Sequence, residues 1–425
     1  MIGSVVGSGI FRTPSTVAQR LHAPVLILCA WAAGGIVALF GAFILGELAA
    51  RRPQGCGIYA YLHDAFHPVV AFAYGWTSLL ASFSGGLAAA AVLFAGYFTV
   101  LTGFHIASGL LAAIALAVLA LVNCLGVRQG SNVQNGLTVL KLAAFAAIIV
   151  AGFAAHPALS PGPPLSTATP STLAAFSFAM IPVLFTYNGA MVANFMATEV
   201  KRATIALPLG LWLGVSGVAV LYLLVNAACI HALGVGGLGG TDVPASAVLF
   251  VAVGSPGARL ASLVIAVSTL GFIGNRMLTV PRLYHAMAQD GLFFRSVASI
   301  GPRTRVPVVA IVLQAIVAIV IALTGSFENI LSYVVSTFYV FNGLSALALF
   351  VIRARDRRAG NARAVDFRVP WHPVSTTIYI FASFGVAIAT YIAYPREAFF
   401  GLLILLSAIP VYFVWVRSSP SKRTA

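Results

Sequence analysis

Charged residues are scarce in this chain, and their scarcity excludes a soluble globular protein. Only 8% of the 425 residues are charged and only nine are acidic, against about 25% charged residues in soluble domains. Hydrophobic residues make up 60% of the chain, and the mean hydropathy is +1.00. A helix needs about 20 mostly apolar residues to cross a bilayer. The many stretches of this kind therefore predict an integral membrane protein.

Cysteine is scarce too, and the patterns of a metal site or a cleaved leader are missing. The four cysteines have no CxxC spacing, so we expect no disulfide framework. His63 and His67 lie four apart in HDAFH, but no HExxH is present, and a solvated inner loop is the simpler interpretation. The apolar stretch at Met1 has neither a basic leader nor an A-x-A-like site. We expect no catalytic residues, no metal and no cofactor.

A glycine-rich segment, GVGGLGG at 234–240, matches the GxGxxG pattern of dinucleotide-binding folds. That pattern requires a preceding strand, and here a membrane span precedes it. We predict instead an extracytoplasmic loop in which Thr241 or Asp242 caps a short helix.

Hydropathy, with proline, glycine and charge as boundaries, predicts twelve membrane spans. They cover residues 1–20, 24–50, 69–101, 107–123, 136–155, 173–198, 207–231, 257–286, 306–325, 329–352, 374–394 and 398–416.

The basic residues lie mainly between these spans and predict the orientation. With the N-terminus in the cytoplasm, the inner loops and the tail hold 17 of the 24 Lys and Arg residues, and the outer loops hold only Arg20, Arg259 and Arg396. This asymmetry obeys the positive-inside rule and predicts that both termini are cytoplasmic. It also explains the net charge of +15 without nucleic acid. Membrane lipids with anionic head groups are the expected partner of these residues.

Spans 1 and 6 contain glycine and polar residues where a continuous helix would disfavour them. The segments are GSVVGSGIFRTP at 3–14 and PVLFTYNGAMVANF at 182–195, and each interior glycine costs a helix about 1 kcal/mol. An unwound Gly7-Ser8-Gly9 would offer the free N–H groups of a half-helix beginning near Ile10 to a carboxylate, and the free carbonyls before the break to an ammonium group. The break in span 6 would offer the same groups from the opposite side.

The two segments lie five spans apart, an odd offset that indicates an inverted repeat with broken helices at its interface. The alternative interpretation is that the small residues only allow close helix packing.

Three charged residues inside spans need an explanation. Lys141 in GLTVLKLAAFAAIIV is unfavourable at this depth unless it snorkels, pairs or loses its proton. One interpretation is that Lys141 snorkels to the cytoplasmic surface. The other is that its cation takes the place of a coupling ion, or that it titrates and links transport to protons. Arg276 in span 8 is a candidate for lining a cavity. Glu47 is expected to pair with nearby arginines such as Arg51 and Arg52, as a gate latch or as an ordinary interfacial ion pair.

Five local patterns resemble those of the amino acid/polyamine/organocation (APC) transporter family, in the family's order along nearly the whole chain. They are GSGIFRTPS, GELAARRPQGCGIYAYLHDAF, LGVRQGSNVQNGLTVLKL, FTYNGAMVANFMATEVKRATIALP and VPRLYHAMAQDGLFF. The resemblance is to bacterial members related to the L-type amino acid transporters.

The resemblance implies an all-α integral membrane protein with a LeuT-type 5+5 inverted repeat plus two C-terminal helices. In a single transporter domain spanning 1–425, repeat one would cover 1–155, repeat two 173–352, the two extra helices 374–416 and a cytoplasmic tail 417–425. It implies a carrier of neutral amino acids in the bacterial inner membrane, and not an enzyme. The expected mechanism is alternating access.

The resemblance also implies the site residues. The substrate carboxylate would bind the backbone at the break, and the amine would contact carbonyls around both breaks, with Phe185 as a gate. The predicted substrate-binding residues are Val5, Gly7, Ser8, Gly9, Ile10, Phe185, Asn188 and Gly189. Lys141 matches the lysine that fills a sodium-site position in sodium-independent members, which favours proton symport or exchange without choosing between them.

Two departures from the family pattern remain. Only six residues precede Gly7, about 9 Å of helix against roughly 15 Å for half of the bilayer core. We expect either a start upstream of Met1 or a product that lacks part of its inner gate. The segment LTGFHIA at 101–107 has no cysteine, so a covalently attached partner subunit is not expected. A non-transporting sensor or degenerate paralogue is the alternative function.

Overall fold

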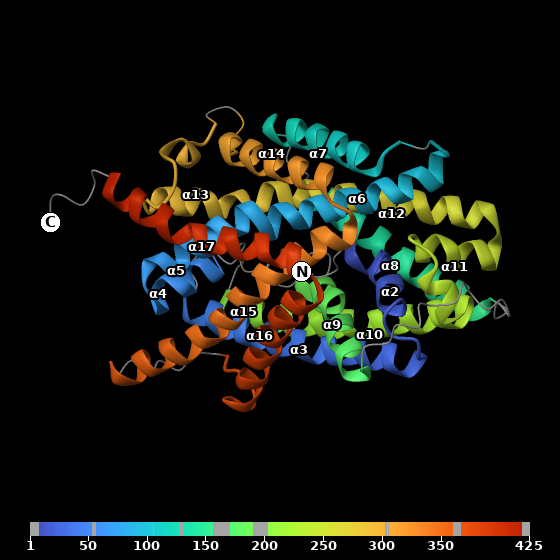
Figure 1. Cartoon of the computed structure of the whole chain (residues 1–425), viewed down its shortest axis with the longest axis horizontal. Coiled ribbons are helices and arrows are strands. Elements are labelled where there is room, and N and C mark those ends of the chain that lie inside the picture. Colours follow the sequence, from blue (N-terminus) through green and yellow to red (C-terminus); the bar gives the residue numbers. More distant parts are fainter. Residues whose placement is uncertain are drawn as a thin grey trace.

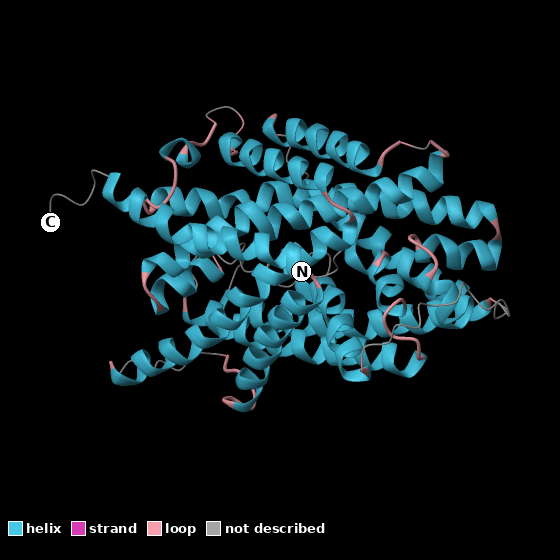
Figure 2. Ribbon diagram, viewed as in Figure 1, coloured by secondary structure: helices cyan, strands magenta, loops and turns pink. Residues whose placement is uncertain are grey.

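The chain is described by a computed structural model at residues 8–52, 57–104, 106–126, 131–155, 171–189, 203–301, 304, 306–359 and 367–418. Across these residues the regular secondary structure is entirely helical, and Figure 2 shows no strand among them. The elements in chain order are η1 (Ser8–Phe11), α2 (Thr13–Ala18), α3 (Pro24–Arg51), α4 (Ile58–Ala65), α5 (Pro68–Thr77), η2 (Ser78–Ser82), α6 (Phe83–Thr102), α7 (Ser108–Cys124), α8 (Ser131–Ala154), α9 (Thr172–Tyr187), α10 (Ala203–Gly239), α11 (Pro244–Val253), α12 (Ser255–Thr279), α13 (Pro281–Gln289), η4 (Arg295–Ala298), α14 (Val308–Thr324), α15 (Phe327–Arg358), α16 (Val374–Ala393) and α17 (Pro395–Ser418).

Eight helical segments within the described residues are long and apolar enough to cross a bilayer. Large apolar side chains point outward from α7, α14 and α17, where Leu121, Ile316 and Phe413 are 67%, 54% and 52% exposed. Exposed apolar surface of this kind suits lipid tails rather than water. The all-helical, multi-pass membrane protein expected from hydropathy is therefore confirmed. The finer arrangement of twelve spans in a LeuT-type inverted repeat stays a prediction.

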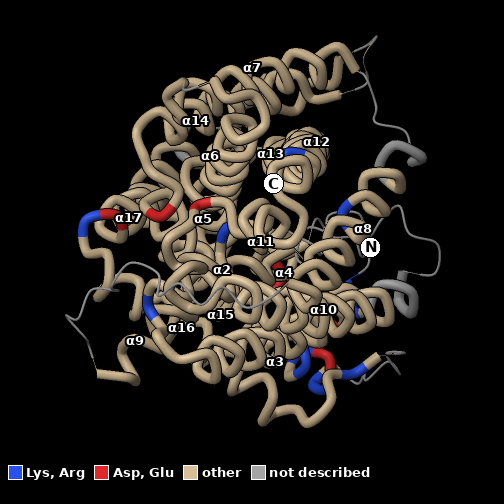
Figure 3. The backbone as a smooth tube through the Cα atoms, turned by 90° about the vertical axis from the view of Figure 1, so that its right-hand side faces the viewer, with Lys and Arg blue, Asp and Glu red and all other residues tan. Residues whose placement is uncertain are grey.

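The long helices lie side by side along the longest axis of the molecule (Figure 1). Helix α6 packs against α12, α14 and α15 in the middle, α7 packs on α14 at one edge, and α3 packs on α10 at the opposite edge. Viewed along the bundle in Figure 3, most of the backbone carries no charged residue. Helices α4 and the end of α15 lie at one end of Figure 1, and α2 and α11 lie towards the other.

Two adjacent glycines bring α3 close to its neighbours. A Cβ atom on Gly34 would lie 2.4 Å from Cγ1 of Val183 in α9, and one on Gly35 would lie 2.9 Å from Cβ of Ala219 in α10. These distances leave no room for a side chain, so the glycines set the separation of the three helices. Helix α9, which carries several predicted site residues, is positioned in this way.

Replacing Gly34 by leucine should therefore push α3 away from α9. Overpacking of this kind destabilises by about 1–3 kcal/mol, and we expect a lower thermal unfolding midpoint for Gly34→Leu in detergent, measured by tryptophan fluorescence. The matched control is Gly385→Leu, because a Cβ atom at Gly385 of α16 meets nothing within 4 Å. Equal midpoints for the two variants would contradict the close packing.

The glycine-rich segment differs from the predicted loop. Gly234 interrupts α10 with φ 65° and ψ 170°, and a short second helical segment follows this kink and ends at Gly239. The predicted caps are also wrong, because Val243 is the N-cap residue of α11. The hydroxyl of Thr241 instead accepts a hydrogen bond from the N–H of Val243 at 3.2 Å.

Candidate functional site

The first predicted break contains a 3₁₀ segment rather than regular α-helix. Element η1 ends at Phe11, and Arg12 has φ −126° and ψ −41° before α2 begins at Thr13. Two contacts fix η1 in the bundle: the hydroxyl of Tyr97 in α6 donates to the Phe11 carbonyl at 2.6 Å, and the Phe11 ring stacks on Phe145 of α8 at 5.0 Å. The position of η1 is thus set by two other helices.

The C-terminal end of α9 meets η1. Helix α9 ends at Tyr187, whose hydroxyl donates to the carbonyl of Trp31 at 3.1 Å. One residue earlier, Oγ1 of Thr186 bonds Oγ1 of Thr13 at 2.8 Å. A Cβ atom on Gly9 would lie only 2.9 Å from Oγ1 of Thr186. The two segments predicted as breaks are therefore in direct contact.

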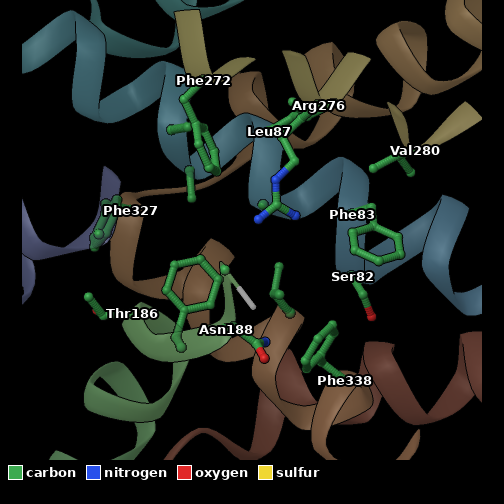
Figure 4. Close-up of a pocket in the computed structure, with 17 residues that line it drawn as sticks. Ser82, Phe83, Leu87, Thr186, Asn188, Phe272, Arg276, Val280, Phe327 and Phe338 are labelled. Atoms are coloured by element: carbon green, nitrogen blue, oxygen red, sulfur yellow. The ribbon is translucent and has the colours of Figure 1, made fainter. Parts of the chain in front are cut away.

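A pocket lies where η1 and α9 face α6, α12 and α15 (Figure 4). Most of the lining is apolar, and the charged or polar side chains are few. The lining residues are Gly9, Ser82, Phe83, Gly86, Leu87, Ala89, Ala90, Phe185, Thr186, Asn188, Gly189, Phe272, Arg276, Val280, Phe327, Val334 and Phe338. The three helices α6, α12 and α15 correspond to the predicted spans 69–101, 257–286 and 329–352.

The predicted substrate-binding residues fall into three groups. Gly9, Phe185, Asn188 and Gly189 line the pocket. Ser8 begins η1, and Ile10 is buried with 1% exposure outside the lining. Val5 and Gly7 lie outside the described residues. The role of all eight in binding a substrate stays a prediction.

Lys141 lies behind one wall of the pocket. Its side chain is only 4% exposed, and its ammonium nitrogen is 5.4 Å from the ring centroid of Phe272, which lines the pocket. This burial disagrees with the snorkelling interpretation, because a snorkelling lysine would present its nitrogen at the surface. The proposed coupling role is a separate matter and stays a prediction.

Sequence reasoning missed most of the pocket lining. Hydropathy identifies α12 as a span but does not say which face points inward. Phe272, Arg276 and Val280 are spaced by four residues and so share one helix face. An arginine on that face was the available signal, and the expectation that Arg276 lines a cavity is confirmed.

A buried carboxylate joins three segments at one end of the bundle. Glu47 of α3 has a fully buried side chain and accepts from Arg51 at 2.8 Å and from Nε and Nη2 of Arg353 in α15 at 2.8 and 2.5 Å. It also accepts from the backbone N–H of Val369 at 2.7 Å. The predicted pairing of Glu47 with Arg51 is confirmed, and the pairing with Arg353 was not foreseen.

The same end carries a second set of ion pairs. Arg51 and Arg52 reach Asp356 of α15 at 2.5 and 3.5 Å, and Arg52 also pairs with Asp64 of α4 at 2.6 Å. Burial first, and then the positive charge of the nearby arginines, lower the pKa of His372. Helices α3, α4 and α15 are thus tied together by charge.

Toward the other end of the bundle, α2 and the residues that flank it contact the α10–α11 connection. Arg12 pairs with Asp242 at 2.9 Å, Oγ of Ser15 donates to the carbonyl of Thr241 at 2.5 Å, and the amide of Gln19 donates to the carbonyl of Gly239 at 2.8 Å. The guanidinium of Arg12 also lies over the ring of Phe327, a pocket-lining residue.

Membrane-length helices around a mostly apolar pocket, with ion pairs toward both ends of the bundle, are the architecture expected of a membrane transporter. The pattern of the amino acid permease family matches residues 1–415, nearly the whole chain. The chain belongs to this family, whose members are amino acid transporters and not enzymes.

Known relatives match over almost the same length. The b(0,+)-type amino acid transporter 1 of Mus musculus is 28% identical, over 98% of this chain and 86% of the relative. The serine/threonine exchanger SteT of Bacillus subtilis is 28% identical, over 97% of this chain and 94% of the relative. The large neutral amino acids transporter small subunit 2 of Homo sapiens is 26% identical, over 98% of this chain and 78% of the relative.

Proposed function

We propose that the chain is a secondary active carrier that moves amino acids by alternating access around the pocket between η1 and α9. The observation that carries this proposal is the contact of Gly9 with Thr186 at the pocket wall, where a Cβ atom would come within 2.9 Å of the hydroxyl. Two segments 177 residues apart in the sequence thereby meet at one pocket, which supports the inverted repeat expected from the five-span offset.

The ends of the two segments carry complementary groups for an amino acid. Backbone N–H groups of Ser8, Gly9 and Ile10 are the proposed ligands of the α-carboxylate, because the first N–H groups of a helix have no intrahelical partner. Carbonyls around Phe185 and Asn188, at the C-terminal end of α9, are the proposed ligands of the amine, because the negative end of the helix dipole attracts a cation.

The mechanism we propose uses the two sets of ion pairs as alternating latches. By the positive-inside rule the Glu47 side faces the cytoplasm and the Arg12–Asp242 side faces outward, in a bacterial inner membrane with both termini cytoplasmic. The underlying architecture would be the LeuT-type repeat, 1–155 and 173–352, followed by the helices of 374–416. The relatives include an exchanger, which supports exchange as the mode of transport, and proton symport is the proposed alternative. No covalently attached subunit is expected.

Lys141 is the proposed coupling group, because its buried cation lies beside the pocket-lining ring of Phe272. Lys141→Ala should lower proton-driven uptake by about tenfold or more, the factor that corresponds to losing ~1.4 kcal/mol of interaction. Lys141→Arg keeps the charge but cannot release a proton. It should therefore retain exchange while losing the dependence of uptake on a proton gradient. Unchanged rate, pH dependence and exchange stoichiometry in Lys141→Ala would remove this role.

The test of the function is counterflow in proteoliposomes. Liposomes containing the purified chain are loaded with one unlabelled amino acid at a time, and entry of the labelled compound is measured with and without proton and sodium gradients. We expect accelerated entry for at least one α-amino acid and none for its decarboxylated analogue. Specific binding without accelerated entry would support a sensor instead, and neither binding nor entry would overturn the proposal.

A further inference from the structure

Arg276 places a cation inside the pocket. It lies on α12, one turn after Phe272, and its guanidinium carbon is 4.9 Å from the centroid of that ring. Figure 4 shows the guanidinium pointing into the middle of the pocket between Phe83 and Phe272, toward Asn188 on the far side. The surrounding lining is largely apolar.

No carboxylate of the described residues compensates this charge. Seven of the nine acidic residues are described, none of them lines the pocket, and none forms an ion pair or hydrogen bond with Arg276. Glu199 and Asp366 lie outside the described residues. Carboxylates elsewhere are engaged with other arginines, such as Glu47 with Arg353 and Asp242 with Arg12.

A second cation lies against the same ring. The ammonium nitrogen of Lys141 is 5.4 Å from the Phe272 centroid, so one aromatic ring contacts two cations. Cation–π attraction only partly offsets the removal of two charges from water. Within the described residues Lys141 has no acidic partner either. This side of the pocket is therefore electropositive and favours an anion.

We infer that Arg276 binds a second carboxylate of the substrate, so that the pocket selects amino acids with an acidic side chain. The α-carboxylate would lie at Gly9, and the side-chain carboxylate would lie on the guanidinium fork of Arg276, which points toward Asn188. The inference rests on the proposed function, since it assigns the substrate class of the same pocket. It differs from the neutral substrates that the family resemblance implies.

The test compares an acid with its uncharged amide of nearly the same shape. Uptake of labelled glutamate and glutamine, and of aspartate and asparagine, is measured in proteoliposomes for the full chain and for Arg276→Gln and Arg276→Lys. We expect the native chain to prefer the acid, and Arg276→Gln to lower the acid-to-amide ratio of kcat/KM by about 10- to 100-fold. Arg276→Lys should give an intermediate ratio, and the control Arg259→Gln, an exposed arginine on the same helix, should leave the ratio unchanged.

The outcomes separate this inference from the proposed function. Transport of neutral amino acids with an acid-to-amide ratio that Arg276→Gln does not change would overturn the inference alone. Absence of uptake and binding for every amino acid would overturn both. If replacing chloride by gluconate abolished neutral amino acid uptake in the native chain and had no effect in Arg276→Gln, the anion at Arg276 would be inorganic and the acidic-substrate inference would be wrong.

Discussion

Gly9→Val should abolish amino acid uptake while the protein still inserts into the membrane. A single Cβ atom at this position already comes within 2.9 Å of Oγ1 of Thr186, and valine adds two further methyl groups. Thr186 cannot move aside easily, because its hydroxyl bonds Thr13 at 2.8 Å and the carbonyl of Pro182 at 2.9 Å. Separation of η1 from α9 by as little as 1 Å would misplace the substrate groups, at an expected cost of about 100-fold in rate.

The measurement is counterflow of the transported amino acid, normalised to the amount of protein in the liposomes. Gly217→Val is the matched control, because Gly217 lies on an exposed face of α10 and a Cβ atom there meets nothing within 4 Å. Uptake by Gly9→Val within twofold of the control would show that the contact of η1 with α9 is not part of the transport site.

Glu47→Ala should cause the largest loss of stability. The fully buried carboxylate accepts hydrogen bonds from Arg51, Arg353 and the N–H of Val369. Its removal leaves the Arg353 guanidinium and the Val369 N–H without this acceptor, whereas Arg51 keeps its ion pair with Asp356. Removing one partner of a buried ion pair destabilises by about 3–5 kcal/mol, so we expect the thermal unfolding midpoint to fall by about 3–6 °C.

Tryptophan fluorescence on heating in detergent measures this shift. Glu397→Ala serves as the control, because Glu397 in the first turn of α17 forms no ion pair within the described residues. Adding Arg353→Met to Glu47→Ala should recover part of the lost stability, since it removes the uncompensated charge. A midpoint for Glu47→Ala equal to that of the control would contradict the network.

The helices that span the membrane were predictable from local sequence, because the length of an apolar stretch determines whether it can cross the bilayer. The spans predicted at 24–50 and 374–394 correspond to Pro24–Arg51 and Val374–Ala393. The glycine-rich end of α10 was not predictable in this way. Glycines there indicated a loop, yet a short helical segment follows the kink at Gly234 and ends at Gly239, whose carbonyl accepts a hydrogen bond from the side chain of Gln19. This contact joins residues 220 positions apart, and no local pattern contains it.

The site was predictable only in part for the same reason. Gly9 and Gly189 could be predicted, because glycine destabilises a helix interior and so indicated a break at each position. The face of α12 that bears Arg276 depends on how that helix packs against α6, and the partner of Glu47 is an arginine 306 positions away. Such long-range pairs follow from tertiary packing rather than from hydropathy.

The central claim, that the pocket between η1 and α9 holds the transported amino acid, is tested most directly by a structure. The chain would be imaged by electron cryomicroscopy in lipid nanodiscs with a saturating concentration of the amino acid that gives the fastest counterflow. We predict density for the amino acid with its α-carboxylate at Gly9 and its side chain toward Arg276. Density at another position, with this pocket empty, would contradict the account.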